Sequence, residues 1–194
     1  MKSWIGIVAA LALAACAHSS EAENQDLFFA RLSALCGQAF AGHVLTTDPR
    51  DEAFSTQPLV MHVRECGPKE IRIPFQVGED RSRTWVITRT NRGVRLKHDH
   101  RHADGTEDSV SQYGGDTLDR GTATRQEFPA DEESKDLFLA NDLAASVLNV
   151  WAIEVNEGVF VYELRRPNRL FRVSFDLKHP IPAPPPAWGA SSGD

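Results

Sequence analysis

Residues 170–177 read Leu170-Phe171-Arg172-Val173-Ser174-Phe175-Asp176-Leu177, and from Phe171 onward apolar and polar side chains alternate without a break. Successive side chains of an extended strand point to opposite faces of a sheet. One face of this segment is therefore apolar and the other polar, which predicts a strand that covers a hydrophobic core on one side. The same alternation occurs in Glu70–Val77 and Val159–Leu164.

Similar runs continue from residue 38 to residue 177, separated by the Gly, Pro, Asn and Asp residues that favour turns. Short joins such as Asn91-Arg92-Gly93 and Asn156-Glu157-Gly158 favour hairpins. The predicted strands are Gln38–Thr46, Pro58–Glu65, Glu70–Val77, Thr84–Thr90, Val94–His102, Thr106–Tyr113, Gly121–Phe128, Ser146–Val155, Val159–Leu164 and Leu170–Leu177.

Two helices interrupt the strand pattern. Gln25–Ala34 places Leu27, Phe28 and Leu32 near a 3.6-residue period. Asp131 is a suitable N-cap for a second helix over Glu132–Ala140.

About ten sequential strands with hairpin connections predict a mainly β domain, folded as a single antiparallel up-and-down barrel. A curved sheet or a β-sandwich is the alternative, but closure removes the unpaired edge strands. The strand count is similar to that of the calycins, barrels that bind fatty acids, retinoids or haem. The Gly-x-Trp of the lipocalins is missing from Gln38–Gly42, so the likeness is one of architecture.

The first fifteen residues have the features of a signal peptide: Lys2, an uncharged apolar run, then small residues. The run is shorter than the roughly 20 residues that span a bilayer. Leu13-Ala14-Ala15-Cys16 resembles the lipobox of bacterial lipoproteins. The resemblance implies cleavage before Cys16 and acylation of its thiol, for example by palmitate. Ala17 then implies an outer-membrane anchor with the domain facing the periplasm; an ordinary signal that contains a cysteine is the alternative.

These features divide the chain into a lipoprotein signal peptide (1–15), a lipidated cysteine with its tether (16–24), a barrel domain (25–178) and a Pro-rich tail (179–194). The formal net charge is −6. A chain of this sign has no electrostatic footprint for nucleic acid, so contact with the membrane is expected only through the lipid.

Two cysteines remain for the folded domain, Cys36 and Cys66. In an oxidising compartment we expect a disulfide between them, worth roughly 3–4 kcal/mol in the chain-entropy model. Ligation of a metal by the two thiolates is the alternative, although the spacing lacks the close cysteine pairs of a zinc site.

Three histidines alternate along one predicted strand, at His98, His100 and His102. They share a face with Val94 and Leu96, so they are expected to point inward. Imidazoles two residues apart on a strand can converge on one divalent metal ion, and these three are the candidate metal ligands. Glu107, Asp108 and Tyr113 follow on the next predicted strand. They are expected either to add an oxygen ligand or to hold the rings by hydrogen bonds without any metal.

Three functions are consistent with these patterns. The first is non-catalytic binding of a small amphiphilic or anionic ligand inside the barrel, by His98, His100, Tyr113, Gln126 and Asn149. The second is a metal-binding protein or metal-dependent enzyme that uses the histidines. The third is an envelope scaffold with a filled barrel.

The chain contains no Gly-x-Ser-x-Gly, Ser-x-x-Lys, His-Glu-x-x-His or phosphate-loop motif, so no catalytic residue is predicted. Arg81 and Arg83 are expected in a solvated loop. The stretches Gly78–Trp85, Leu96–His102 and Tyr113–Asp116 resemble a family of uncharacterised secreted or lipid-anchored proteins of Gram-negative bacteria. This resemblance covers much of residues 27–189 and implies no activity.

Overall fold

A computed structural model describes residues 23–190 of the chain. The predicted signal peptide and Cys16 lie outside the described residues. Across residues 23–190, no helix is long and apolar enough to cross a membrane.

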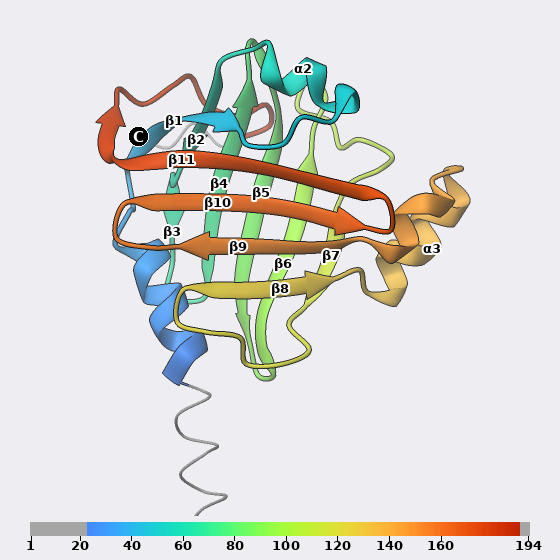
Figure 1. Ribbon diagram of the computed structural model, residues 1–194, viewed down its shortest axis with the longest axis horizontal. Helices are drawn as coiled ribbons and strands as arrows, with labels where there is room; N and C mark the ends of the chain where they lie inside the picture. The colour runs from blue at the N-terminus through green and yellow to red at the C-terminus, as the bar shows by residue number, and fades with distance from the viewer. Residues whose placement is uncertain (1–22, 191–194) are drawn as a thin grey trace, which may run out of the picture.

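The described chain forms one antiparallel sheet that curves into a nearly closed barrel (Figure 1). Around the barrel the strand order is β7-β6-β5-β4-β2-β1-β11-β10-β9-β8, and β3 pairs with β4 beside this path. The strands are β1 (Ala39–Val44), β2 (Leu59–His62), β3 (Glu65–Cys66), β4 (Glu70–Val77), β5 (Asp80–Thr90), β6 (Gly93–His100), β7 (Tyr113–Asp116), β8 (Arg125–Pro129), β9 (Val150–Val155), β10 (Val159–Arg166) and β11 (Arg169–Ile181). The predicted calycin-like β-barrel is therefore confirmed.

The barrel is two meanders joined where β1 pairs with β11. In Figure 1, β4–β7 run upright at the back, while β8–β11 run across them at the front. The apolar faces point into the space between the two groups. Phe171, Val173 and Phe175 are 4, 0 and 0% exposed, as the alternation along β11 predicts. Trp85 on β5 stacks on Tyr162 of β10 with ring centroids 4.5 Å apart, which joins the two groups through the core.

At the seam between the edge strands β7 and β8, single contacts bridge the barrel in place of a ladder. There the Asp131 N–H donates to the carbonyl of Gly114 at 2.9 Å, and the Gly114 N–H donates to Ser134 Oγ at 2.8 Å. A Cβ on Gly115 would lie 1.8 Å from the carbonyl oxygen of Pro129. The backbones approach so closely only because this position has no side chain.

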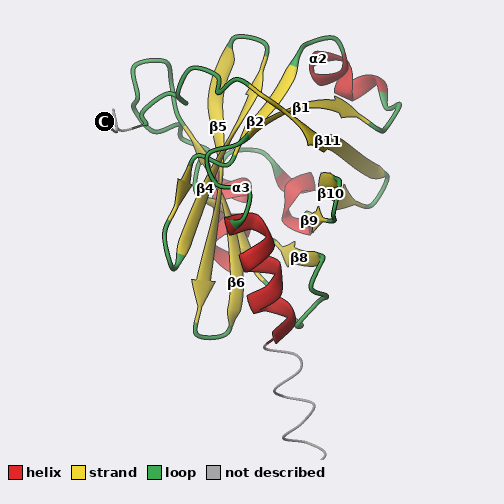
Figure 2. Cartoon of the chain, turned by 90° about the vertical axis from the view of Figure 1, so that its left-hand side faces the viewer, coloured by secondary structure: helices red, strands yellow, loops and turns green. Residues whose placement is uncertain are grey.

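Three helices and two 3-10 turns complete the domain. A helix over residues 23–33 packs at one end of the barrel; at the other end lie η1 (Pro49–Asp51), α2 (Glu52–Ser55), α3 (Glu132–Ala140) and η2 (Ala144–Leu148) (Figures 1 and 2). The predicted Asp131 cap is confirmed, since its side chain accepts from the Ser134 N–H. In the N-terminal helix Phe28 and Leu32 are buried as predicted, but Leu27 is 44% exposed.

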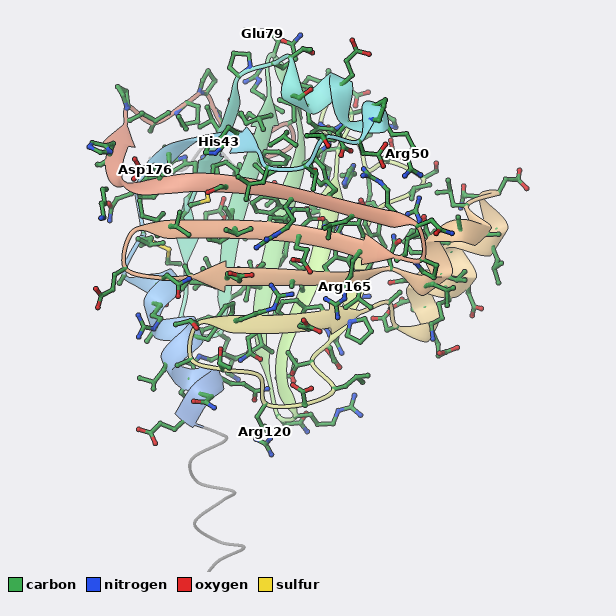
Figure 3. All side chains as sticks on the ribbon, viewed as in Figure 1. His43, Arg50, Glu79, Arg120, Arg165 and Asp176 are labelled. Carbon is green, nitrogen blue, oxygen red and sulfur yellow. A yellow bond between two sulfur atoms is a disulfide. The ribbon has the colours of Figure 1, made fainter. Side chains whose placement is uncertain are left out.

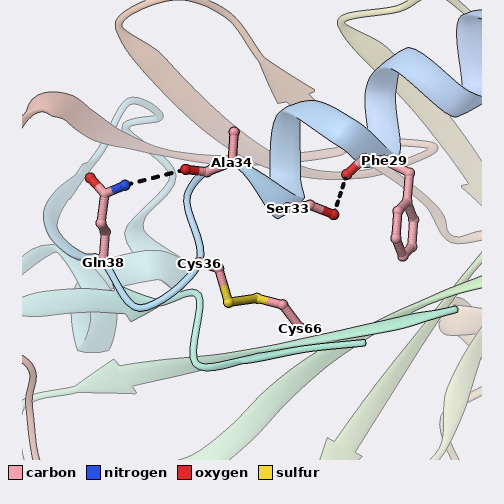
Figure 4. Close-up of a disulfide and its surroundings, with 6 residues drawn as sticks. All are labelled: Phe29, Ser33, Ala34, Cys36, Gln38 and Cys66. Atoms are coloured by element: carbon pink, nitrogen blue, oxygen red, sulfur yellow. Dashed lines mark hydrogen bonds between the residues drawn. A yellow bond between two sulfur atoms is a disulfide. The ribbon is translucent and has the colours of Figure 1, made fainter. Parts of the chain in front are cut away.

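The predicted disulfide is present between Cys36 and Cys66, with Cα atoms 6.2 Å apart. It links the turn after the N-terminal helix to β3 (Figure 4). The disulfide therefore fixes the helix to the end of the barrel that it covers.

Three strand predictions were wrong in whole or in part. Gly121–Phe128 is a turn up to Thr124, and β8 begins only at Arg125. Thr106–Tyr113 is mostly a loop, and β7 begins only at Tyr113. Asp108 binds the Val110 N–H through its side chain and Gln112 takes φ 56°, so the polar residues of this segment form local turns instead of a ladder. The start of Ser146–Val155 is the turn η2, and the strand begins at Val150.

Substituting Gly115 tests the seam. Gly115→Ala is expected to lower the free energy of unfolding by about 1–3 kcal/mol, because its Cβ would overlap backbone atoms. Urea denaturation followed by circular dichroism measures the change. Gly67→Ala is the control: its Cβ would lie 3.5 Å from the nearest atom, an ordinary contact. Equal losses in the two variants would contradict the close approach of β7 and β8.

Candidate ligand-binding site

A cavity of about 240 Å³ lies inside the barrel, at the end away from the N-terminal helix. Residues of the strands, of α2 and α3, and of η2 line it. Much of the wall is aromatic, with contributions from Phe75, Trp85, Tyr113, Trp151 and Tyr162. The predicted ligand-binding residues His98, His100, Tyr113 and Asn149 all line this cavity.

His98 is fixed at the inner wall of β6. Its side chain is buried and stacks on the ring of Tyr113, with centroids 4.7 Å apart. Nδ1 lies 3.1 Å from the backbone carbonyl of Tyr113, and Nε2 lies 2.9 Å from the hydroxyl of Tyr162. A carbonyl only accepts, so Nδ1 carries the hydrogen and Nε2 accepts from Tyr162 when the ring is neutral.

Burial lowers the pKa of His98 to about 3, with smaller contributions from His100 and Lys97. Burial also raises the pKa of Tyr113 to about 12 and raises that of Tyr162 well above its ordinary value. At neutral pH the inner wall therefore presents a neutral imidazole and two protonated phenols.

His100 lies one step further toward the opening of the cavity. Its Nε2 is 3.0 Å from the hydroxyl of Tyr113. Burial and the nearby Arg83 lower the pKa of His100. Tyrosines therefore hold the two inward histidines. Of the partners predicted from the sequence, Tyr113 contacts the rings, whereas Glu107 does not.

His102 does not join the other two histidines. It follows the end of β6, its side chain is exposed, and its Nδ1 lies 4.0 Å from Asp108. Glu107 accepts from Ser111 and from Gln112 instead of facing the cavity. Across residues 23–190, no three His, Cys, Asp or Glu side chains come together as a metal site would require.

Gln126 is inward-facing but lies outside the cavity. Its side chain is fully buried and Nε2 donates to the carbonyls of Arg120 and Thr122. Gln126 pairs with Ile153 of β9, whereas the cavity begins at Trp151. This register places the amide nearer the closed end of the barrel.

Three arginines of the cavity wall were not predicted from the sequence: Arg83, Arg166 and Arg169. Arg83 was expected in a solvated loop, but it lies within β5 and its side chain is 27% exposed. Arg83 precedes Trp85 by two positions and Arg166 follows Leu164 by two, so strand alternation places each on the inner face. The alternation along β5 and β10 could therefore have identified Arg83 and Arg166 as inward-facing.

No family model, curated protein or solved structure shows significant similarity to this chain. The resemblance to a family of envelope proteins therefore stays a prediction. The function of the cavity must follow from its own residues.

The neutral His98 makes stability depend on pH. The unfolded chain takes up a proton on this side chain near pH 6.5, but the folded protein does so only near pH 3. The unfolded state binds more protons between these values, so the free energy of unfolding falls as pH falls, by up to about 1.4 kcal/mol per pH unit for one histidine.

Urea denaturation at pH 4.5, 5.5 and 6.5 should show this slope, and His98→Gln should make it shallower. His102→Gln, a change at an exposed side chain, should leave the slope as it is. Identical slopes in the wild type and His98→Gln would contradict a buried, neutral His98.

Proposed function

We propose that this protein binds a small, largely apolar ligand in the barrel cavity and does not transform it. The observation that carries the proposal is a cavity of about 240 Å³ walled by aromatic side chains in an otherwise filled barrel. Protein interiors are close-packed, so an open aromatic cavity with a few polar groups is typical of a ligand site.

The contacts of the polar groups favour binding over the other two functions. Both ring nitrogens of His98 are engaged by protein oxygens, so a metal ion would have to displace these hydrogen bonds. A scaffold that used only its outer surface would gain stability from a filled interior. The cavity is therefore better explained by an occupant.

We also propose that the domain is anchored at the outer membrane through acylated Cys16 and faces the periplasm. The lipobox supports this proposal, and the Cys36–Cys66 disulfide suits a compartment outside the cytoplasm. The N-terminal helix follows the proposed tether and packs at the barrel end opposite the cavity. In this arrangement the cavity takes its ligand from the periplasm.

Filling the cavity tests ligand binding. Val110 lines the cavity, and Val110→Trp is expected to exclude the ligand by occupying its space. The full chain is purified in a non-ionic detergent, extracted with organic solvent and analysed by mass spectrometry, with elemental analysis of the same sample. A small organic compound should accompany the wild type and be lost from Val110→Trp.

Leu118→Trp adds the same ring at a side chain that is 85% exposed, and it should retain the compound. Equal extracts from all three proteins would contradict binding in the cavity. Stoichiometric zinc, iron or copper that disappears in His98→Ala/His100→Ala would instead support the metal-binding function.

Lipid attachment is tested at Cys16. Cells grown with an alkyne fatty acid should label the wild-type protein, which should fractionate with the outer membrane. Cys16→Ser should abolish the label, because the acylated thiol is gone. Label that persists in Cys16→Ser, or absence of label in the wild type, would contradict the proposed anchor.

A further inference from the structure

Arg166 is the cation of the cavity wall that has no carboxylate partner within residues 23–190. It ends β10, is half-buried, and donates from Nη1 to Asn149 Oδ1 at 2.9 Å. Among residues 23–190, no carboxylate lies within ion-pair distance of its guanidinium. Its only hydrogen-bond partner there is thus a neutral amide.

The other two arginines of the wall are neutralised. Arg83 pairs with Asp80 at 2.5 Å. Arg169 pairs with Asp51, whose side chain is 1% exposed. None of the residues that line the cavity is itself acidic. The excess positive charge at the cavity therefore belongs to Arg166.

Arginines on the outside of the same strands are treated differently. They form a continuous network of ion pairs with glutamates of β8–β10, near the labelled Arg165 in Figure 3. The members are Arg125, Glu127, Glu154, Glu163, Arg165 and Arg172. Among the described arginines of β8–β11, Arg166 alone has no carboxylate partner.

The polar groups next to Arg166 are hydrogen-bond donors. Because Arg166 can only donate, Asn149 must turn Oδ1 toward it, which leaves the Nδ2 hydrogens without a partner among the described residues. A carboxylate accepts through both oxygens and matches a guanidinium in a two-bond geometry. Burial, with Arg169 and Arg50 nearby, also lowers the pKa of Arg166, as expected where cations gather.

The shape of the cavity limits the rest of the ligand. At about 240 Å³ it is smaller than the roughly 300–1,000 Å³ of sites for drug-sized ligands. Its rings meet one another both stacked and tilted: Trp85 lies at 17° to Tyr162, whereas Phe54 lies at 51° to Phe171. A further ring can pack on such a wall in an offset or edge-to-face contact.

We propose that the ligand is a small aromatic monocarboxylate, with its carboxylate on Arg166 and the amide of Asn149 and its ring among the aromatic side chains of the cavity wall. The inference rests on the proposed ligand-binding function. Beyond that function, it specifies two properties of the ligand: a negative charge and an aromatic ring.

Isothermal titration calorimetry on the full chain in a non-ionic detergent tests the proposal with three probes: 3-phenylpropionate, 3-phenylpropionamide and octanoate. The acid should bind at least ten-fold more tightly than its amide and more tightly than octanoate. Arg166→Gln should weaken binding of the acid at least ten-fold and weaken binding of the amide less. Arg92→Gln removes the same charge from an exposed side chain at the β5–β6 turn. This variant should bind the acid and the amide with the wild-type affinities.

Equal binding of the acid and the amide to the wild type would overturn the role of charge while leaving ligand binding intact. Tighter binding of octanoate would overturn the aromatic class. If none of the probes binds, the inference fails; a compound lost on Val110→Trp in the extraction experiment would then show that the cavity function itself stands. The wild-type comparison of acid with amide needs no variant, so it holds even if Arg166→Gln does not fold.

Discussion

The close approach of the edge strands β7 and β8 is the constraint on which the rest of the structure depends. Edge strands with free N–H and C=O groups invite pairing with other chains. Here the edges meet through Gly114 and Gly115, and α3 begins directly beside them at Asp131. The same approach brings β6 opposite β9 and β10. His98 can therefore reach the hydroxyl of Tyr162, and the cavity acquires a continuous wall.

The fold was largely predictable because burial of one face imposes a period of two along each strand. The same rule placed His98, His100, Tyr113 and Asn149 together, since inward side chains at one end of a barrel meet. It failed where local hydrogen bonds compete with the ladder, as in the loop that contains Asp108. The α2 helix is one turn of four residues, too short to leave a periodic signal.

Position along the barrel axis was not predictable from alternation alone. Gln126 and Asn149 are both inward and polar, yet only Asn149 lines the cavity. The register of each strand determines which of the two side chains reaches the cavity. Register depends on turns and bulges, and the alternation of apolar and polar residues does not reveal these. Arg83 shows the converse error. Its inward direction was encoded by alternation, but it was expected in a solvated loop because long cationic side chains are seldom buried without partners.

The distribution of charge connects the barrel to its proposed role. The chain carries a net charge of −6, yet its cavity wall has three arginines and no acid. If this arrangement served stability alone, a carboxylate near Arg166 would be favourable, as it is for Arg169 beside Asp51. Under the proposed function, the carboxylate of the ligand would supply the counter-charge that Arg166 lacks. A net negative exterior would at the same time repel acidic ligands at long range, so binding of an acid must be driven at short range, by the guanidinium and the aromatic wall together.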